Sequence, residues 1–345
     1  MTTASAAGTP QSIAPPLYAR KQPPLPAQIL LGGFLHGGFA PLVWTLEKLG
    51  GAPSFFAFAS RGRRKEFERK NPFRGYTPGP QDVFVMTFAK SGTNWMMQIA
   101  HQLIWHARAE YDHIHCAVPW PDTKVMGGPL SRYAIALEDA VHWQWAPERK
   151  RVIKTHFDWD LLPYSGQARY IAVIRDPKDI FVSSYFFLRD GLMGPAMPSL
   201  ETWYKLFLSR DFLIGGSWAV NTASYWAQRQ RPNVLVMSFK EMKRDLRGSV
   251  VKVADFLDIH AGGSIVDEVC RQSSFGYMKQ MDHKFAMGQL IPWMKPGAMI
   301  RKGTQGGSAE LLTPGQQREM DAYFQAELQR LGSDFPYEEF CDLAR

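Results

Sequence analysis

The sequence predicts an α/β protein of a single domain, in which a central parallel sheet is covered by helices on both faces. From residue 82 onward, short apolar runs alternate with segments of helical periodicity, which is the pattern of repeated strand-then-helix units. The chain has 345 residues, of which 45% are hydrophobic and 21% are charged. It can therefore bury a large core and is not disordered throughout. Its length would also fit two domains, but one large α/β domain accounts for it equally well.

The individual elements follow from local patterns. Strands are predicted at short apolar runs, at 83–88, 151–154, 170–174 and 234–237. Helices are predicted after residue 93, where Trp95, Ile99 and Leu103 have i, i+4 spacing, and at 179–187 and 246–257. A last helix within 309–331 begins at Thr313-Pro314, a cap followed by proline at the first helical position.

The N-terminal part of the chain has a different composition from the rest. Residues 1–26 are rich in Ala, Ser, Thr and Pro and have no period, so we expect a mobile arm. They are a poor secretory signal, because Arg20 and Lys21 come late and no cleavage pattern follows an apolar core. Residues 27–80 form an apolar and then basic extension, and the domain itself is predicted over 81–345.

The extension leaves two interpretations open. No acidic or basic residue lies between Lys21 and Glu47, and the basic run RGRRKEFERK at 61–70 follows. An apolar segment beside a basic cluster is typical of peripheral membrane contact, here through residues 27–70. Four glycines, His36 and Pro41 dilute the apolar segment, so its similarity to a membrane span is marginal. We therefore favour a helix that packs on the core or covers the site as a lid.

Cysteine content and charge limit the compartment and the partners. Cys116, Cys270 and Cys341 are too few and too scattered for a disulfide framework or a zinc site, which favours a reducing compartment, and we expect a cytoplasmic protein. Forty Lys and Arg residues against 32 Asp and Glu give a net charge of +8. Such a balance favours an anionic partner: nucleic acid, membrane lipid or a phosphorylated small molecule.

A phosphate-binding turn is predicted where the first strand ends. Lys90-Ser91-Gly92-Thr93 lies between a strand and a helix, where backbone N–H groups can converge on an anion at the positive helix end. Lys90 adds a point charge. The turn is not a Walker A loop, because the lysine precedes the glycine.

Three further segments place polar residues after predicted strands or in a glycine-rich loop. Lys154-Thr155-His156 follows the second strand, and a histidine there can act as a general base. Arg175 ends the third strand, and Ser183 follows on the next helix, so both can reach one anion. Arg301-Lys302-Gly303 opens a glycine-rich loop that could wrap a phosphate.

Taken together and in this order, these segments resemble the cytosolic-type sulfotransferase family, from about residue 82 to the C-terminus. The resemblance implies a P-loop-like sulfotransferase fold and transfer of a sulfuryl group from 3′-phosphoadenosine 5′-phosphosulfate (PAPS) to a hydroxyl or amine of a small, apolar acceptor. It implies His156 as the general base, with Lys90 and Lys154 as the other catalytic residues. Adenosine 3′,5′-bisphosphate (PAP) would be the product, and no metal would be required.

The resemblance also implies how the nucleotide is held. The loop from Lys90 to Asn94 would bind the 5′-phosphosulfate, and Trp95 and Phe275 would lie against the adenine. Arg175, Ser183 and the Arg301 loop would hold the 3′-phosphate. The full set of implied nucleotide-binding residues is Lys90, Ser91, Gly92, Thr93, Asn94, Trp95, Arg175, Ser183, Ser273, Phe275, Arg301, Lys302 and Gly303.

Some positions depart from the family pattern. Ala89 replaces the usual proline before the loop lysine, Asn94 replaces a frequent second threonine, and Ala219 replaces a tyrosine that often contacts adenine. The short dimerisation motif of the family is broken at Ala309, Pro314 and Arg318. A dimer of the family type is therefore not predicted, and the oligomeric state stays open.

The acceptor is not specified by the sequence. Seven aromatic residues could line an apolar cavity or belong to the core: Trp120, Trp143, Trp145, Tyr185, Phe186, Phe187 and Trp293. Two alternatives to a sulfotransferase also remain. A kinase would need Mg²⁺ and acidic ligands, and a binding protein would retain the fold without turnover. A nucleic-acid partner is not expected, since no recognition motif occurs.

Overall fold

The computed structural model of the chain describes residues 23–126, 135–139, 141–212, 215–286, 290–293, 299–303 and 306–344. Most of the arm predicted at 1–26 lies outside the described residues. Helix α1 (Leu25–Gly32) begins two residues before the boundary that was predicted for the arm.

A four-stranded parallel sheet forms the centre, in the order β2-β1-β3-β4. The strands are β1 (Asp82–Thr87), β2 (Arg151–Thr155), β3 (Arg169–Ile174) and β4 (Val234–Ser238). Each lies within one residue of its predicted bounds, so the fold class is confirmed. Every residue of β1 is buried, as expected for a parallel strand that is covered on both faces.

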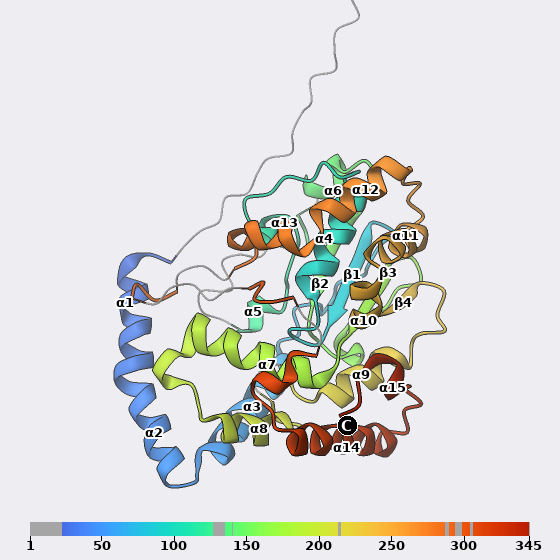
Figure 1. Ribbon diagram of the computed structural model, residues 1–345. Helices are drawn as coiled ribbons and strands as arrows, with labels where there is room; N and C mark the ends of the chain where they lie inside the picture. Colours follow the sequence, from blue (N-terminus) through green and yellow to red (C-terminus); the bar gives the residue numbers. More distant parts are fainter. Residues whose placement is uncertain are drawn as a thin grey trace, which may run out of the picture.

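Alternate residues of β1 enter different cores. Val83 and Val85 pack with α4 and α11, whereas Phe84 and Met86 pack with a separate cluster on the other face. This alternation is the period of two that a strand imposes on its side chains. The two faces of the sheet therefore have separate hydrophobic layers, and Figure 1 shows helices on either side of the strands.

Helices α4 (Thr93–Ile104), α10 (Phe239–Arg244), α11 (Leu246–Phe256), α12 (Gly263–Gln272) and α13 (Phe275–Gln280) belong to one side. The other side holds α7 (Pro177–Leu188), α8 (Leu200–Phe207), α9 (Trp218–Trp226) and α14 (Pro314–Arg330). The remaining α-helices are α2 (Ala40–Lys48), α3 (Ala52–Arg69), α5 (Thr123–Met126), α6 (Val141–Trp145) and α15 (Tyr337–Phe340). Short 3-10 turns occupy Ile114–Cys116, Trp159–Leu161, Gly194–Ala196, Asp282–Lys284 and Gly307–Glu310, and π turns occupy η1 (Gly33–Phe39) and η5 (Arg189–Met193).

Helix α14 begins where the sequence predicts it. The Thr313 hydroxyl accepts a hydrogen bond from the Gln316 backbone N–H, and the Gln316 side chain accepts one from the Thr313 N–H. This reciprocal pair is a capping box, which satisfies two N–H groups that a helix start otherwise leaves without partners.

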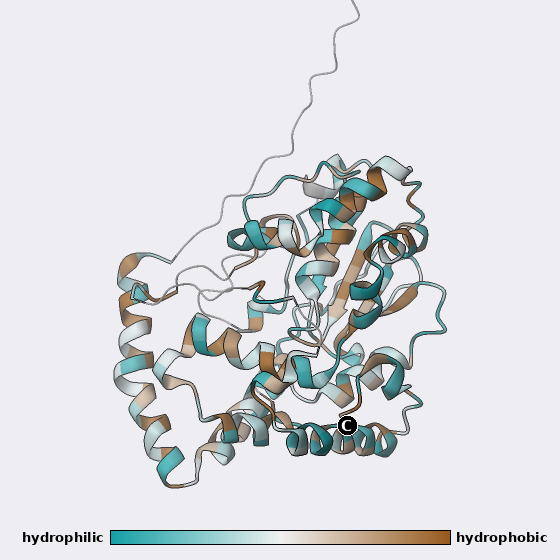
Figure 2. Cartoon of the chain, viewed as in Figure 1, coloured by the Kyte–Doolittle hydropathy of each residue, from teal (hydrophilic) through white to brown (hydrophobic). Residues whose placement is uncertain are grey.

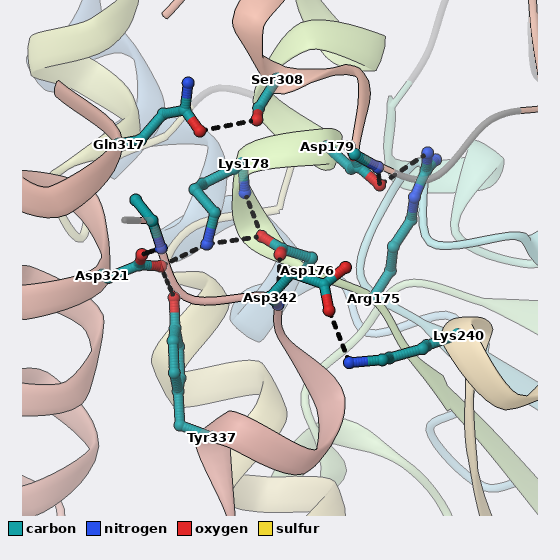
Figure 3. Close-up of polar contacts among 12 residues, drawn as sticks. Arg175, Asp176, Lys178, Asp179, Lys240, Ser308, Gln317, Asp321, Tyr337 and Asp342 are labelled. Carbon is teal, nitrogen blue, oxygen red and sulfur yellow. Dashed lines mark hydrogen bonds and ion pairs between the residues drawn. The ribbon is translucent and has the colours of Figure 1, made fainter. Parts of the chain in front are cut away.

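A buried ion network fixes the start of α7 (Figure 3). Asp176 caps the helix by accepting from the Lys178 N–H, and its other oxygen accepts from the Asp342 N–H. The Lys178 ammonium pairs with Asp176 and with Asp321 of α14. These contacts join the start of α7 to α14 and to the C-terminal residues. Because the charged groups are almost fully buried, loss of one partner would leave the other uncompensated and destabilise the protein. The network thereby holds the strand end that carries Arg175.

The N-terminal extension forms one long helix followed by α3. Helix α1, the π turn η1 and α2 are continuous over Leu25–Lys48. Figure 1 shows this helix along one edge of the molecule, with α3 returning beneath the body.

Candidate active site

The predicted site residues gather around one cavity of about 720 Å³ at the carboxyl edge of the sheet. Its walls include every residue predicted for the site except Ser91. The side chain of Ser91 is fully buried beneath the loop instead. Ligands commonly bind at this edge in open α/β sheets. The cavity has one polar part near the loop after β1 and one apolar part near the N-terminal extension.

The loop after β1 has an unusual backbone. Lys90 and Gly92 both have positive φ angles, 71° and 97°. At Gly92 an added Cβ would lie 2.7 Å from the Phe239 ring, so only glycine fits there without a shift. The left-handed turns carry the chain from β1 straight into α4. Backbone N–H groups at such a turn and at the following helix start form a concavity for anions.

Two buried hydroxyl groups beside this loop have no hydrogen-bond partner among the described residues, those of Ser91 and Ser273. Buried polar groups normally have partners. Ser273 is tied to the start of α4, because the Trp95 indole N–H donates to the Ser273 carbonyl at 2.8 Å. Unsatisfied hydroxyls at the edge of a cationic loop fit the binding of a polar, anionic ligand.

Arg175 joins this loop to helix α7. Its guanidinium donates to the Lys90 carbonyl at 3.0 Å, lies 3.5 Å from Asp179 and stacks over Phe239 at 4.3 Å. Burial lowers the pKa of Arg175, but a guanidinium keeps its charge in proteins. Ser183 faces the same cavity from two turns further along α7.

The Arg301 loop closes another side of the cavity. Arg301 and Lys302 both bind the Glu310 carboxylate, at 2.8 Å and 3.0 Å. Gly303 has a φ of 59°, and a Cβ there would lie 2.2 Å from the Phe275 ring. The ring of Phe275 therefore rests directly on the glycine backbone. The structure brings these residues to the cavity, although Glu310 was not predicted as their partner.

His156 is held in a defined orientation. Its Nδ1 lies 2.9 Å from the Thr87 carbonyl oxygen. A carbonyl only accepts hydrogen bonds, so Nδ1 carries the proton and Nε2 keeps its lone pair. Burial, and then the charge of Lys154, lower the pKa of His156 to about 3. The imidazole is therefore neutral near pH 7 and able to accept a proton.

Two lysines with lowered pKa values lie around the same cavity. Burial lowers the pKa of Lys154 to about 7, and its ammonium lies 3.3 Å from the centroid of the Trp120 ring and 3.4 Å from His115 Nε2. Burial, and then the charge of Arg175, lower the pKa of Lys90 to about 7 as well. Binding of an anion between them would favour their charged forms.

Asp122 is a site residue that the sequence analysis missed. Its carboxylate accepts a hydrogen bond from the His156 backbone N–H at 2.7 Å and lines the cavity. Burial raises its pKa to about 6. No motif or spacing connects position 122 to position 156, so only the folded chain reveals the contact.

The structure decides which of the aromatic candidates line the apolar part of the cavity. Of the seven aromatic candidates only Trp120 and Phe187 line it, and Trp143, Trp145, Tyr185, Phe186 and Trp293 do not. Trp145 and Trp293 are exposed, and Tyr185 and Phe186 of α7 are partly buried against the core. The wall is instead built mainly from Leu35, Phe39, Phe55, Phe56, Phe157, Leu161, Val182, Leu188, Leu192 and Met193. Four of these belong to the extension, which therefore packs on the body and encloses the site.

The described residues contain no group of three or more His, Cys, Asp or Glu side chains that could hold a metal ion.

Comparison with known proteins agrees with this site. A family model described as sulfotransferase domain matches residues 80–332. The chain belongs to the sulfotransferase family. Its predicted family is thereby confirmed, and it is an enzyme that transfers a sulfuryl group to an acceptor.

Curated relatives support the same assignment, and a solved structure has the same fold. Sulfotransferase 2A1 of Macaca fascicularis is 28% identical over 292 residues, which cover 82% of this chain and 96% of that protein. Amine sulfotransferase of Oryctolagus cuniculus is 29% identical, covering 76% of this chain and 84% of that protein. A structure of retinol dehydratase with androsterone and the inactive cofactor PAP aligns at a TM-score of 0.68 and 18% identity, over 80% of this chain and 88% of that chain. The similarity to this structure shows that the chain has the same fold.

Proposed function

We propose that the protein transfers the sulfuryl group of PAPS to a hydroxyl or amine of a small apolar acceptor in the cytoplasm. One observation carries the proposal. The Nδ1 of His156 is engaged by the Thr87 carbonyl, which leaves Nε2 as an acceptor beside the same cavity that Lys90 and Lys154 line. A neutral base next to two cationic groups suits the removal of a proton from an acceptor near an anionic donor group.

The residues present fit PAPS. Lys90 and the turn to Asn94 offer an ammonium and backbone N–H groups for the phosphosulfate end. Arg175, Ser183 and the Arg301 loop offer charged donors for a second phosphate. The unsatisfied hydroxyl of Ser273, which lines the cavity, is a further group that such a ligand could engage. PAPS would supply the sulfuryl group that is transferred, with Trp95 and Phe275 against the adenine.

The chain's own groups would act as follows. His156 Nε2 accepts the proton of the acceptor, and the Thr87 carbonyl keeps the ring oriented through Nδ1–H. A well-placed base typically contributes about 10²–10⁴-fold in rate, or about 3–5.5 kcal/mol of barrier. Lys90 and Lys154 stabilise negative charge as the sulfuryl group leaves its phosphate. Because lysine and arginine supply this charge, we expect no metal ion to take part.

The apolar wall of the cavity indicates which class of acceptor the enzyme uses. Phe39, Phe55, Phe56 and Phe157 offer aromatic surface on which an apolar acceptor can pack. We therefore propose phenols or hydrophobic alcohols as the preferred acceptors, with hydrophobic amines also accepted.

The decisive experiment follows radiolabelled sulfate from PAPS to a panel of phenols, alcohols and amines. We expect His156→Ala to lower kcat by roughly 10²–10⁴-fold while calorimetry shows nearly unchanged PAP affinity. His260→Ala is the matched control, because His260 is exposed outside the cavity, and it should keep full activity. Undiminished turnover by His156→Ala would remove the base assignment. Equal affinity for PAP and AMP would overturn the nucleotide assignment, and PAP binding without turnover on any acceptor would favour a binding protein.

A further inference from the structure

The long N-terminal helix has an uncharged outer face. The exposed large hydrophobic side chains of α1, η1, α2 and α3, together with Leu49 between them, are named here the apolar surface. Eight of the fourteen large hydrophobic residues that are exposed among the described residues belong to it: Leu25, Ile29, Leu30, Phe34, Leu42, Trp44, Leu49 and Phe58. No acidic or basic residue lies between Lys21 and Glu47. Such a concentration of exposed apolar side chains in one segment of the chain marks an interaction surface.

The helix is not a buried core helix. Leu25–Lys48 has 24 residues, which correspond to about 36 Å. By length and composition it could cross a membrane, yet only 17% of its most apolar window is buried in the protein. Figure 2 shows mostly apolar and near-neutral residues along it. The outer face is therefore open to a partner of matching chemistry.

The inner face of this helix is fixed to the body. Ala40 and Val43 are fully buried, and Trp44, which is 53% exposed at the border of this face, donates through its indole N–H to the Pro195 carbonyl at 3.0 Å. The Glu47 carboxylate accepts from the backbone N–H and hydroxyl of Ser199 and from the hydroxyl of Thr202. A helix held by these contacts cannot also be surrounded by lipid. It can lie in the plane of a membrane surface but does not span the membrane.

Positive charge continues from the apolar surface along α3. The run 61–70 has six basic and two acidic residues, a net charge of +4. Phe58, Arg61, Lys65 and Arg69 follow each other at spacings of three and four residues, so they share one face of the helix. All four are exposed, and Arg61 and Arg69 also pair with Asp211 and Glu66 at the surface. Phe58 of the apolar surface and the basic residues are therefore adjacent on α3.

We propose that the apolar surface, together with the basic face of α3, binds the interfacial region of an anionic lipid bilayer. The uncharged face would enter the boundary between headgroups and acyl chains, with Trp44 at headgroup level. Arg61, Lys65 and Arg69 would contact anionic headgroups. This charge complementarity favours a bilayer over a second copy of the chain, whose apolar surface would bring an equally basic helix to the contact. The proposal concerns a surface outside the cavity and does not depend on the proposed reaction.

Co-sedimentation of the full chain with vesicles tests the proposal. We expect the protein to pellet with vesicles of phosphatidylcholine mixed with phosphatidylserine, and less with phosphatidylcholine alone. The double variant Leu30→Ser/Phe58→Ser should lose at least tenfold in binding to both kinds of vesicle. Lys65→Gln/Arg69→Gln should lose only the preference for phosphatidylserine, and salt should have the same effect on the wild type. Leu331→Ser/Leu343→Ser, which removes exposed leucines elsewhere, should bind like the wild type.

Three outcomes would overturn the proposal. The first is a wild type that stays in the supernatant with both kinds of vesicle, and the second is a Leu30→Ser/Phe58→Ser variant that pellets like the wild type. A wild-type dimer that dissociates in Leu30→Ser/Phe58→Ser and ignores vesicles, as judged by analytical ultracentrifugation, would identify a contact between copies instead. Calorimetry with PAP and circular dichroism verify that each variant is folded. Vesicle binding is measured without turnover, so a failure here is distinguishable from a failure of the proposed reaction.

Discussion

At the scale of single residues, His156 is oriented by two groups that lie far from it in the sequence. The Thr87 carbonyl engages the ring, and the Asp122 carboxylate engages the backbone N–H. Only the first acts directly on the imidazole. Asp122 is therefore a positioning residue, and its negative charge also raises the pKa of the neighbouring Lys154.

The charge of Asp122 gives a pH-dependent prediction. Asp122→Asn keeps an oxygen for the His156 N–H but removes the negative charge. Because that charge favours the ammonium of Lys154, its loss lowers the pKa of Lys154 below about 7. Lys154 then becomes neutral at a lower pH, and the alkaline limb of kcat/KM for PAPS shifts to lower pH. Initial rates at subsaturating PAPS, measured on both sides of neutrality, record the shift.

The control is Asp160→Asn, at an exposed aspartate outside the cavity, whose profile should match the wild type. A purely structural role for Asp122 would lower the rate equally at every pH. An alkaline limb that stays in place or moves upward in Asp122→Asn would therefore contradict the electrostatic coupling.

At the scale of elements, the contact between the Arg301 loop and α13 shapes the proposed adenine site. Gly303→Ala would bring a Cβ within 2.2 Å of the Phe275 ring, so the ring must leave its position. We expect roughly tenfold weaker PAP binding, because stacking of a base on an aromatic ring contributes about 1–3 kcal/mol. Isothermal calorimetry with PAP measures the loss.

Gly306→Ala provides a matched control for this effect. Gly306 also has a positive φ, 73°, but open space lies around its Cβ position, so its replacement strains the backbone without moving Phe275. The loss of PAP affinity should be clearly smaller. Phe275→Ala should weaken PAP binding about as much as Gly303→Ala, with little further loss in the double variant. Equal losses at Gly303 and Gly306 would attribute the effect to backbone strain alone.

The elements themselves could be predicted, because local patterns specify them. Continuous apolar runs such as 170–174 indicate strands that are buried on both faces, and Thr313-Pro314 indicates a helix start. The strand-end positions of Lys154 and Arg175 also follow from the sheet. Contacts between distant segments could not be predicted in this way. Asp122 beside His156 and Phe275 on Gly303 depend on how loops meet in space.

The acceptor wall shows the same limit. Aromatic residues serve both cores and cavities, so composition does not separate Phe187, which lines the cavity, from Phe186, which packs beside the core. The extension was also hard to interpret from its sequence. Its glycines weaken the apolar pattern, and the π turn η1 interrupts the 3.6-residue period before Phe39. Only the folded chain shows that one face walls the cavity while the other is open.

At the scale of the whole molecule, the extension gives two functions to one helix. Its inner face contributes Leu35 and Phe39 to the cavity, and its outer face forms the apolar surface. Helix α3 repeats the arrangement, with Phe55 and Phe56 at the cavity and Phe58 exposed. A bilayer bound to the outer face would thus lie next to the wall of the acceptor site. An apolar acceptor dissolved in that bilayer would be concentrated close to the enzyme.

Separating the two faces by mutation gives a last prediction. Phe39→Ala removes a side chain that packs against Phe55 and Phe56 at the cavity wall. Because burying such a side chain contributes about 1.5–3 kcal/mol, we expect KM for an apolar acceptor to rise roughly 10–100-fold. KM for PAPS should stay unchanged. Leu30→Ser on the outer face should leave both constants unchanged for a water-soluble phenol assayed without vesicles. Steady-state kinetics with each substrate varied in turn measure the effect. A rise in KM for PAPS in Phe39→Ala would contradict the prediction, because it would show that the helix supports the nucleotide part of the site as well as the acceptor part.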